Sequence, residues 1–380
     1  MFANKSSSHM FSVLFAVISL LALTFGAVGV TPAYATTGAS LIVNTATDEN
    51  ASNSNCSLRE AIIAANTNAN YNGCTGTGTY GADTITFVAS LNGTPITLIG
   101  SQLPAVTTVI TITGNGAANT IVQANAAPKI ATYRVFQVNA SGNLTLDGLT
   151  VKNGQCNGSC ATATGSGGGI YNVGTLTVTN STFSGNSATN GGGVFNSSGG
   201  TLMVMNSTFS GNSATSRGGG ISNLSGGTTL TNGTFINNSA NYGGGMSNAS
   251  NSGLGTTLTN VTFSGNSSSQ GSSRGLFNTG SSKLYIRNSI FWDSIVTTSE
   301  PQIENNSATL IELYDSVIQD GCPTRSICSN VITDDPLLGA LGNYGGFTQT
   351  IPLLPSSAAI DAGDSAVCVA TPVTGWISAA

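Results

Sequence analysis

The sequence has almost no histidine and very little charge. Its single histidine is His9, and Asp, Glu, Lys and Arg together make up 7% of the 380 residues. Without histidine in the rest of the chain, a serine or cysteine nucleophile would lack its usual base. Because paired Cys-x-x-Cys motifs are also missing, we expect no metal site and no cofactor. No basic patch accompanies the net charge of −5, so we expect no nucleic-acid partner.

Carboxylates are missing from the long middle part of the chain. From Gln155 to Ser282, the only charged residues are Arg217 and Arg274. Glycoside hydrolysis needs two carboxylates, and polysaccharide lyases typically need carboxylates for calcium together with a basic residue. This part of the chain is therefore predicted to carry neither kind of active site.

Long apolar runs are also rare, and the one that exists lies near the N-terminus. It extends from Phe11 to Val30, follows Lys5, and precedes an Ala-x-Ala site that ends at Ala35. This pattern predicts a signal peptide over residues 1–35, with an uncleaved anchor as the alternative. Since no other run is long enough to cross a bilayer, we expect a secreted or cell-surface protein without a membrane span in the mature chain.

A repeated unit fills the middle of the sequence. Each copy begins with a Gly-Gly-Gly-x-x-Asn stretch and continues with a stretch such as TLTVTNSTFSGNSA. One apolar position of the unit recurs every 26 to 28 residues, at Phe183, Phe209, Phe235, Phe263, Phe291 and Ile318. A fixed period in this range indicates a solenoid.

The chemistry of the unit selects one kind of solenoid. Leu176 and Val178 alternate with Thr177 and Thr179, and this period of two predicts strands. A leucine-rich repeat would contain more leucine, a propeller blade would be longer, and a calcium-binding roll would repeat an aspartate. We therefore predict an all-β fold, a right-handed parallel β-helix like that of pectate lyases.

In such a fold, each repeated residue stacks against the equivalent residue of the next coil. The phenylalanines are predicted to form a buried aromatic stack, and a series of asparagines is predicted to form a ladder at a turn. Asparagine tolerates the left-handed backbone conformation, and its amide can bond the next copy. The asparagine series is Asn180, Asn206, Asn232, Asn260 and Asn288, and it ends in Asp315.

A short helix is predicted before the first coil. Ser57 and Glu60 form a capping-box pattern, and the apolar residues that follow lie on one helical face. We expect this helix, Ser57–Asn66, to be the only one in the mature protein and to cover the open end of the solenoid.

The seven cysteines suit an exported protein. Proximity in the sequence predicts three disulfides and leaves Cys368 unpaired. The predicted pairs are Cys56–Cys74, Cys156–Cys160 and Cys322–Cys328.

Two terminal motifs carry a resemblance to a known family. CSLREAIIAAN at Cys56–Asn66 resembles the CSLREA motif of secreted bacterial parallel β-helix proteins. The segment Asp335–Asp364 is similar to the "choice-of-anchor Q" segment that closes those proteins, and the repeats loosely resemble those of polymorphic outer-membrane proteins. The resemblance implies a secreted or surface β-helix. It also implies more sequence beyond Cys368, so the atypical residues 370–380 indicate a truncated or frame-shifted end.

These observations divide the sequence into five parts. After the signal peptide, we expect an N-terminal cap at 36–82, the repeats at 83–333, the anchor-like segment at 334–369 and the atypical tail at 370–380.

Two groups of residues in the last coils are candidates for a site. Asp293 and Asp320 follow Phe291 and Ile318 by two residues each, so they should stack on adjacent coils. Carboxyls about 5 Å apart suit a retaining glycosidase or a shared cation. The alternative is that both lie in solvated turns, where aspartate is common.

The second group lies on the outer face of the strands. Tyr285, Arg287, Glu312 and Tyr314 occupy positions that carry threonine in most earlier coils, and they could bind a sugar or a partner surface. A simple surface ion pair between Arg287 and Glu312 is the alternative. The Thr-x-Thr repeats also resemble those of ice-binding solenoids, although a methionine pair interrupts them.

We therefore expect a non-catalytic, adhesin-like scaffold that binds polysaccharides, glycans or proteins of cell surfaces. The alternative is a polysaccharide lyase or glycoside hydrolase that uses Asp293 and Asp320, followed by the ice-binding solenoid.

Overall fold

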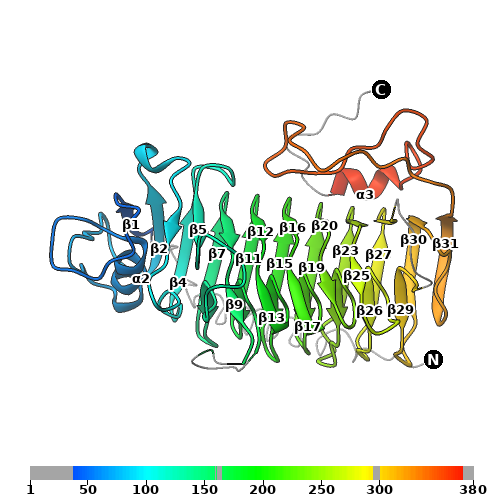
Figure 1. The fold of residues 1–380 in the computed structure, drawn as a ribbon, viewed down its shortest axis with the longest axis horizontal. Helices are drawn as coiled ribbons and strands as arrows, with labels where there is room; N and C mark the ends of the chain where they lie inside the picture. The colour runs from blue at the N-terminus through cyan, green and yellow to red at the C-terminus, as the bar shows by residue number, and fades with distance from the viewer. Residues whose placement is uncertain (1–36, 159, 161–164, 294–299, 371–380) are drawn as a thin grey trace, which may run out of the picture. The chain divides into compact units, whose positions relative to one another are not determined.

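The computed structural model describes residues 37–158, 160, 165–293 and 300–370. Residues from Thr37 onwards form one compact unit, whereas the expected signal peptide lies outside the described residues. The fold is all-β, and the strands lie side by side in long parallel sheets (Figure 1). This arrangement is compatible with a parallel β-helix solenoid.

The strands form three sheets of 19, 7 and 5 strands. The 19-stranded sheet contains β1 (Thr37–Val43), β2 (Ala82–Phe87), β3 (Ile96–Thr97), β4 (Val109–Thr113), β5 (Ile121–Gln123), β7 (Asn143–Asp147), β8 (Thr150–Lys152), β11 (Thr175–Thr179), β12 (Thr182–Ser184), β15 (Thr201–Met205), β16 (Thr208–Ser210), β19 (Gly227–Thr231), β20 (Thr234–Ile236), β23 (Thr256–Thr259), β24 (Thr262–Ser264), β27 (Leu284–Arg287), β28 (Ile290–Phe291), β30 (Ile311–Ile318) and β31 (Ser326–Ile332). The seven-stranded sheet contains β6 (Phe136–Val138), β10 (Ile170–Asn172), β14 (Val194–Asn196), β18 (Ile221–Asn223), β22 (Met246–Asn248), β26 (Leu276–Asn278) and β29 (Ile303–Asn305). The five-stranded sheet contains β9 (Gln155–Cys156), β13 (Ser187–Asn190), β17 (Ser213–Arg217), β21 (Ser239–Ala240) and β25 (Ser267–Ser268).

Each sequence repeat contributes to all three sheets in turn. The chain passes through β11 and β12 of the largest sheet, then β13 of the smallest and β14 of the third. It then returns to the largest sheet as β15, which pairs with β11 so that Leu176 lies opposite Leu202. One repeat of the sequence is therefore one circuit of the chain.

The predicted alternation and the predicted aromatic stack are both confirmed. Leu176 and Val178 are fully buried, whereas Thr177 and Thr179 are partly exposed. The five phenylalanines of the repeat are fully buried and stack nearly parallel, with ring centroids 4.5 to 4.8 Å apart. Ile318 lies opposite Phe291 and continues the stack.

The predicted asparagine ladder is also confirmed. Its six members have φ between 48° and 54°, the left-handed conformation that asparagine tolerates. Along the ladder, the Asn206 amide donates to Asn180, Asn232 to Asn206 and Asn260 to Asn232, over 3.0 to 3.2 Å.

Two further asparagine ladders lie in the buried interior of the stacked coils. In one, the side-chain amides of the GGG-x-x-Asn series bond each other over 2.7 to 2.9 Å. In the other, hydrogen bonds of 2.9 to 3.0 Å join the side-chain amides of Asn186, Asn212, Asn238 and Asn266. Both series are buried, and these hydrogen bonds keep the buried amides satisfied.

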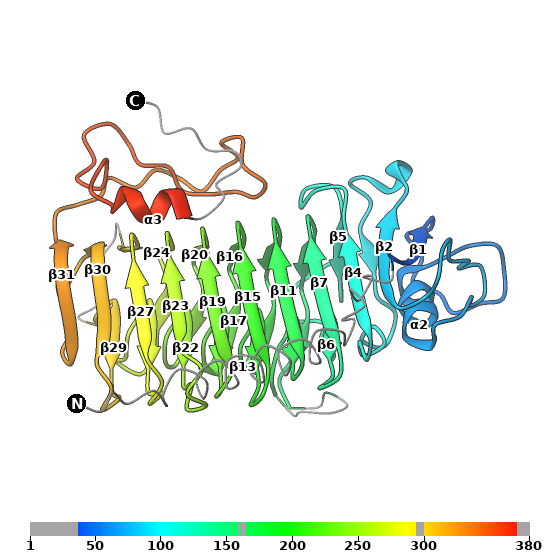
Figure 2. The ribbon, with the colours of Figure 1, turned by 180° about the vertical axis from the view of Figure 1, so that it is seen from behind.

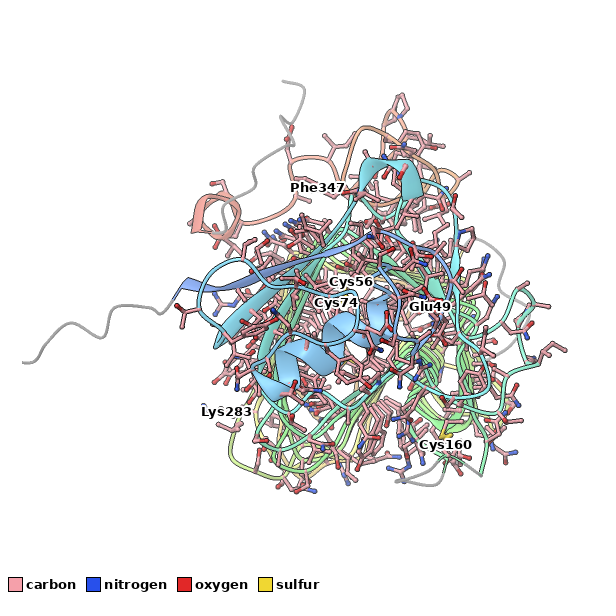
Figure 3. The ribbon with its side chains drawn as sticks, turned by 90° about the vertical axis from the view of Figure 1, so that its left-hand side faces the viewer. Glu49, Cys56, Cys74, Cys160, Lys283 and Phe347 are labelled. Atoms are coloured by element: carbon pink, nitrogen blue, oxygen red, sulfur yellow. A yellow bond between two sulfur atoms is a disulfide. The ribbon has the colours of Figure 1, made fainter. Side chains whose placement is uncertain are left out.

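The predicted helix is present as α2 (Leu58–Thr67), and its capping box is formed. Its predicted apolar face packs against the first coils, since Leu58, Ala61 and Ile62 share one core cluster with Leu41 and Ile85. Figure 3 shows α2 across the end of the stack, with Cys56 and Cys74 beside it.

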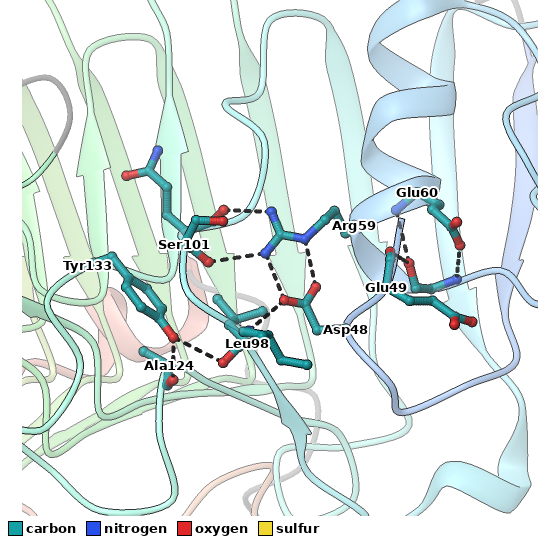
Figure 4. A network of polar contacts seen from close by, with 11 residues as sticks. Asp48, Glu49, Arg59, Glu60, Leu98, Ser101, Ala124 and Tyr133 are labelled. Atoms are coloured by element: carbon teal, nitrogen blue, oxygen red, sulfur yellow. Dashed lines mark hydrogen bonds and ion pairs between the residues drawn. The ribbon is translucent and has the colours of Figure 1, made fainter. Parts of the chain in front are cut away.

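A buried ion pair ties this cap to the following coils (Figure 4). Arg59 donates to both carboxylate oxygens of Asp48 over 2.8 Å, and also to the carbonyls of Ser101 and Gln102. The Asp48 carboxylate additionally accepts from the backbone N–H of Ile99. The side chains are 14% and 1% exposed, respectively, so the pair is largely shielded from solvent.

The expectation of a single helix is wrong. A short second helix, α3 (Ser365–Ala370), follows the last strand, and a single 3₁₀ turn lies at Ala89–Leu91. The anchor-like segment ends in α3 and runs back over the strands (Figures 1 and 2). Thr208 bonds the side chain of Thr348, and the amide of Asn288 bonds the backbone of Asp364. The sequence did not predict this return because its contacts join residues far apart in the chain.

All three predicted disulfides are confirmed. They join Cys56 to Cys74, Cys156 to Cys160 and Cys322 to Cys328. The side chain of Cys368 lies outside the described residues. Among the residues described, no helix is both long enough and apolar enough to cross a membrane.

These pairings predict the outcome of a thiol titration. In denatured, unreduced protein without the signal peptide, we expect one free thiol per chain, that of Cys368, and seven after reduction. The measurement is a colorimetric thiol assay on wild type and on Cys368→Ser, which should show none. More than one thiol in the unreduced wild type would contradict the pairing.

Candidate functional site

The two candidate aspartates lie near each other, but Asp293 is held by the protein itself. Asp293 is 4% exposed and contacts Arg274 at 3.3 Å. Its carboxylate also accepts from the Gly265 backbone N–H and from the Gln302 side chain. The Gln302 backbone N–H in turn donates to Asp320 over 2.6 Å, so Gln302 bridges the two carboxylates.

Burial raises the pKa of Asp293 above its ordinary value. Hydrogen bonds from Gln302 and the charge of Arg274 act in the opposite direction, and Asp320 adds a smaller upward contribution. A raised carboxyl pKa is a property of general acids. Here, however, each oxygen of Asp293 already accepts from a protein donor, so the geometry favours a structural role for this residue.

The second candidate group forms a continuous surface on β27 and β30. In the parallel register, Tyr285 lies opposite Glu312 and Arg287 lies opposite Tyr314. The Arg287 guanidinium is 5.3 Å from the centre of the Tyr314 ring, and the Tyr314 hydroxyl donates to Glu312 over 3.3 Å. All four predicted residues therefore lie together, and we call them the outer-face patch.

Lys283 also belongs to the outer-face patch, although it was not among the predicted residues. Its ammonium is 5.7 Å from the centre of the Tyr285 ring and 3.8 Å from Glu312. The alternation of inward and outward residues that predicted Tyr285 and Arg287 on the outer face also places Lys283 there, two residues before Tyr285. Lys283 could therefore have been predicted from the sequence. Tyr285, and then Glu312, raise the pKa of Lys283 above its ordinary value.

The expected surface pair between Arg287 and Glu312 is replaced by other contacts. Within the described chain, Glu312 has its ion pair with Lys283, and Arg287 contacts an aromatic ring. The parallel register places Tyr285 directly opposite Glu312, and Lys283 and Arg287 lie two residues to either side of Tyr285, so both cations are diagonal neighbours of Glu312.

The same face looks different in the earlier coils. There, the outward positions are Thr177, Met203, Thr229 and Thr257, and Met203 is 41% exposed. No acidic or basic side chain occupies this column before the last coils. In this column of the described strands, the aromatic and charged groups are thus confined to the last coils, whereas the neighbouring outward column carries Asp147 in an early coil.

Among the described residues, no group of three or more His, Cys, Asp or Glu side chains is placed to hold a metal ion. No protein-family model, curated protein or solved structure matches this chain.

Proposed function

We propose that this protein is a secreted or cell-surface scaffold that binds glycans or other cell-surface partners without catalysis. We further propose that the solenoid is right-handed and belongs with the secreted CSLREA-motif proteins that it resembles. The three disulfides support an exported location, because such bonds persist in oxidising compartments.

The outer-face patch is the observation that carries this proposal. It combines two tyrosine rings with two cations and a carboxylate on one partly exposed surface. Aromatic rings supply flat apolar area, and the polar groups around them bind hydroxyls, so the combination suits a sugar chain. The flat strands of a solenoid support it rigidly, which lowers the entropic cost of binding.

The rival function is cleavage of a polysaccharide by Asp293 and Asp320. The buried, fully bonded carboxylate of Asp293 argues against it, although its raised pKa is what a general acid would need. An ice-binding surface has less support, because Met203 interrupts the threonine column.

A binding assay with a panel of polysaccharides tests the proposal. We expect wild-type protein to bind at least one polysaccharide, and Tyr285→Ala with Tyr314→Ala to weaken that binding about tenfold or more, because each buried ring contact contributes about 1 kcal/mol or more. Isothermal titration calorimetry or glycan-array binding measures this effect.

Met203→Ala is the matched control, since it removes an exposed side chain from the same face outside the patch and should leave binding unchanged. The same mixtures are assayed for new reducing ends and for unsaturated products. Turnover that disappears in Asp293→Asn or Asp320→Asn would overturn the scaffold proposal in favour of the enzyme.

A further inference from the structure

We infer that a hollow on the outer face of the seven-stranded sheet is a binding site for a single sugar ring that carries a carboxylate. It is lined by residues of β14, β18 and β22 and by the ends of β13 and β17 of the five-stranded sheet, whereas the outer-face patch lies on the 19-stranded sheet. The inference therefore does not depend on the outer-face patch.

Two serines interrupt a column of aromatic residues on this face. In the register of the sheet, Tyr171, Phe195, Ser222, Ser247 and Phe277 follow each other from coil to coil. Tyr171 and Phe195 stack with ring centroids 5.7 Å apart, but the next two positions have no ring. Because coils repeat about every 4.8 Å, the strand positions of Phe195 and Phe277 are about 14 Å apart. The Tyr242 ring packs 5.2 Å from the Phe277 ring and covers that end of the interval, so the small serines leave space on the Phe195 side.

The space is a cavity of about 230 Å³. Ser222 and Ser247 contribute to its lining, together with Phe195, Leu224 and Ala249. Pockets for drug-sized ligands span about 300 to 1,000 Å³, so this one suits a smaller group, of the size of one sugar ring. Leu224 is 44% exposed, which places an apolar side chain at the solvent side of the hollow.

The lining includes a hydroxyl without a partner. Ser247 is 1% exposed, and its Oγ makes no hydrogen bond to any residue that the structure describes. A buried hydroxyl of this kind costs free energy unless it is bonded, and a ligand hydroxyl or carboxylate would satisfy it.

A cation without a counter-ion also lines the cavity. The Arg217 guanidinium lies 5.9 Å from the centre of the Tyr242 ring and 5.7 Å from that of Phe277, and these rings hold it beside the hollow. Within the described chain it has no acidic partner, whereas Arg274, the other charged residue between Gln155 and Ser282, is paired with Asp293. The charge of Arg217 is therefore available for an anion.

Together these groups define the chemistry of the ligand. A phenylalanine and a leucine provide apolar contact for the C–H face of a sugar ring, and the serines can bond its hydroxyls. The guanidinium can form two parallel hydrogen bonds with a carboxylate, which a neutral sugar cannot match. A uronic acid has all three features.

Calorimetric titration with glucuronic and galacturonic acid oligosaccharides of one to three units tests this inference. We expect an acidic sugar to bind at least tenfold more tightly than its neutral counterpart, glucose or galactose, with little gain beyond one ring. High salt should reduce this preference, since part of it is electrostatic. Sulfated monosaccharides serve as a second anionic probe, and any binding of them at this site should also depend on Arg217.

Two variants locate the site. Arg217→Gln should reduce the binding of the acidic sugars about tenfold and abolish their advantage over neutral ones. Ser247→Phe should fill the hollow and abolish the binding of both. Because phenylalanine already occupies the same column at positions 195 and 277, this variant is compatible with the strand, and its thermal unfolding curve shows whether it folds.

Arg325→Gln is the matched control, because it removes the same charge from an exposed arginine outside both proposed sites and should leave uronic acid binding unchanged. Equal binding of acidic and neutral sugars, or no binding of uronic acids at millimolar concentration, would overturn the inference. Binding that survives both Arg217→Gln and Ser247→Phe but is lost in Arg287→Gln would place the anionic sugar on the outer-face patch. That result would reject the hollow while supporting the proposed function.

Discussion

Replacement of Phe235 by alanine should cost about 3 to 5 kcal/mol of the free energy of unfolding. Phe235 is fully buried, and its ring stacks on Phe209 at 4.8 Å and on Phe263 at 4.6 Å. The substitution removes one ring from the middle of a rigid stack, and the coils on either side cannot collapse into the cavity without breaking the strand register. Urea denaturation followed by circular dichroism measures the loss.

Phe347→Ala is the matched control for this substitution. Phe347 lies in the segment after the last strand and is 52% exposed, so its removal should change the free energy of unfolding by no more than about 0.5 kcal/mol. If both variants lost the same stability, the aromatic stack would not be the main packing element of the solenoid.

Arg59→Ala should be the second strongly destabilising change, at about 3 to 5 kcal/mol. It leaves the nearly inaccessible Asp48 carboxylate without its cation and removes the bonds to the carbonyls of Ser101 and Gln102. Because Arg59 joins the cap to the coils that follow, the cap should detach first. Amide hydrogen exchange should therefore increase in α2 before it increases in the central strands.

Lys283→Ala provides the comparison, since it breaks an exposed ion pair with Glu312 and should cost about 1 kcal/mol or less. Asp48→Ala removes the buried charge itself and should be less harmful than Arg59→Ala. If Arg59→Ala and Lys283→Ala had equal effects, the ion pair of the cap would not contribute to stability as its burial predicts.

The outer-face patch shows how far the sequence leads toward a site. Alternation alone places Tyr285, Arg287, Glu312 and Tyr314 on one face, and the structure brings them together. The partner of each charged group depends on which residues lie directly opposite and on the reach of each side chain. Lys283 and Arg287 are both diagonal neighbours of Glu312, and only the folded structure shows that Glu312 contacts Lys283.

The sequence by itself determined the features that repeat from coil to coil and those that involve only residues close together in the chain. The nearly constant spacing of Phe183 and its copies predicts the buried stack, because equivalent residues of successive coils stack against each other in a solenoid. The left-handed asparagines follow from the intrinsic preference of that residue, and the capping box of α2 needs only residues four positions apart or fewer. The disulfides likewise join cysteines that are close in the chain.

Only the tertiary structure decided which contacts form between distant or differently oriented groups. The two additional asparagine ladders depend on which side chains point inward. Because each repeat contains several asparagines, the sequence does not show which of them do so. The return of the last segment onto Thr208 depends on contacts between residues about 140 positions apart. The hollow at Ser222 and Ser247 exists because neighbouring coils carry larger side chains in the same column, and that comparison requires the register of the folded sheet.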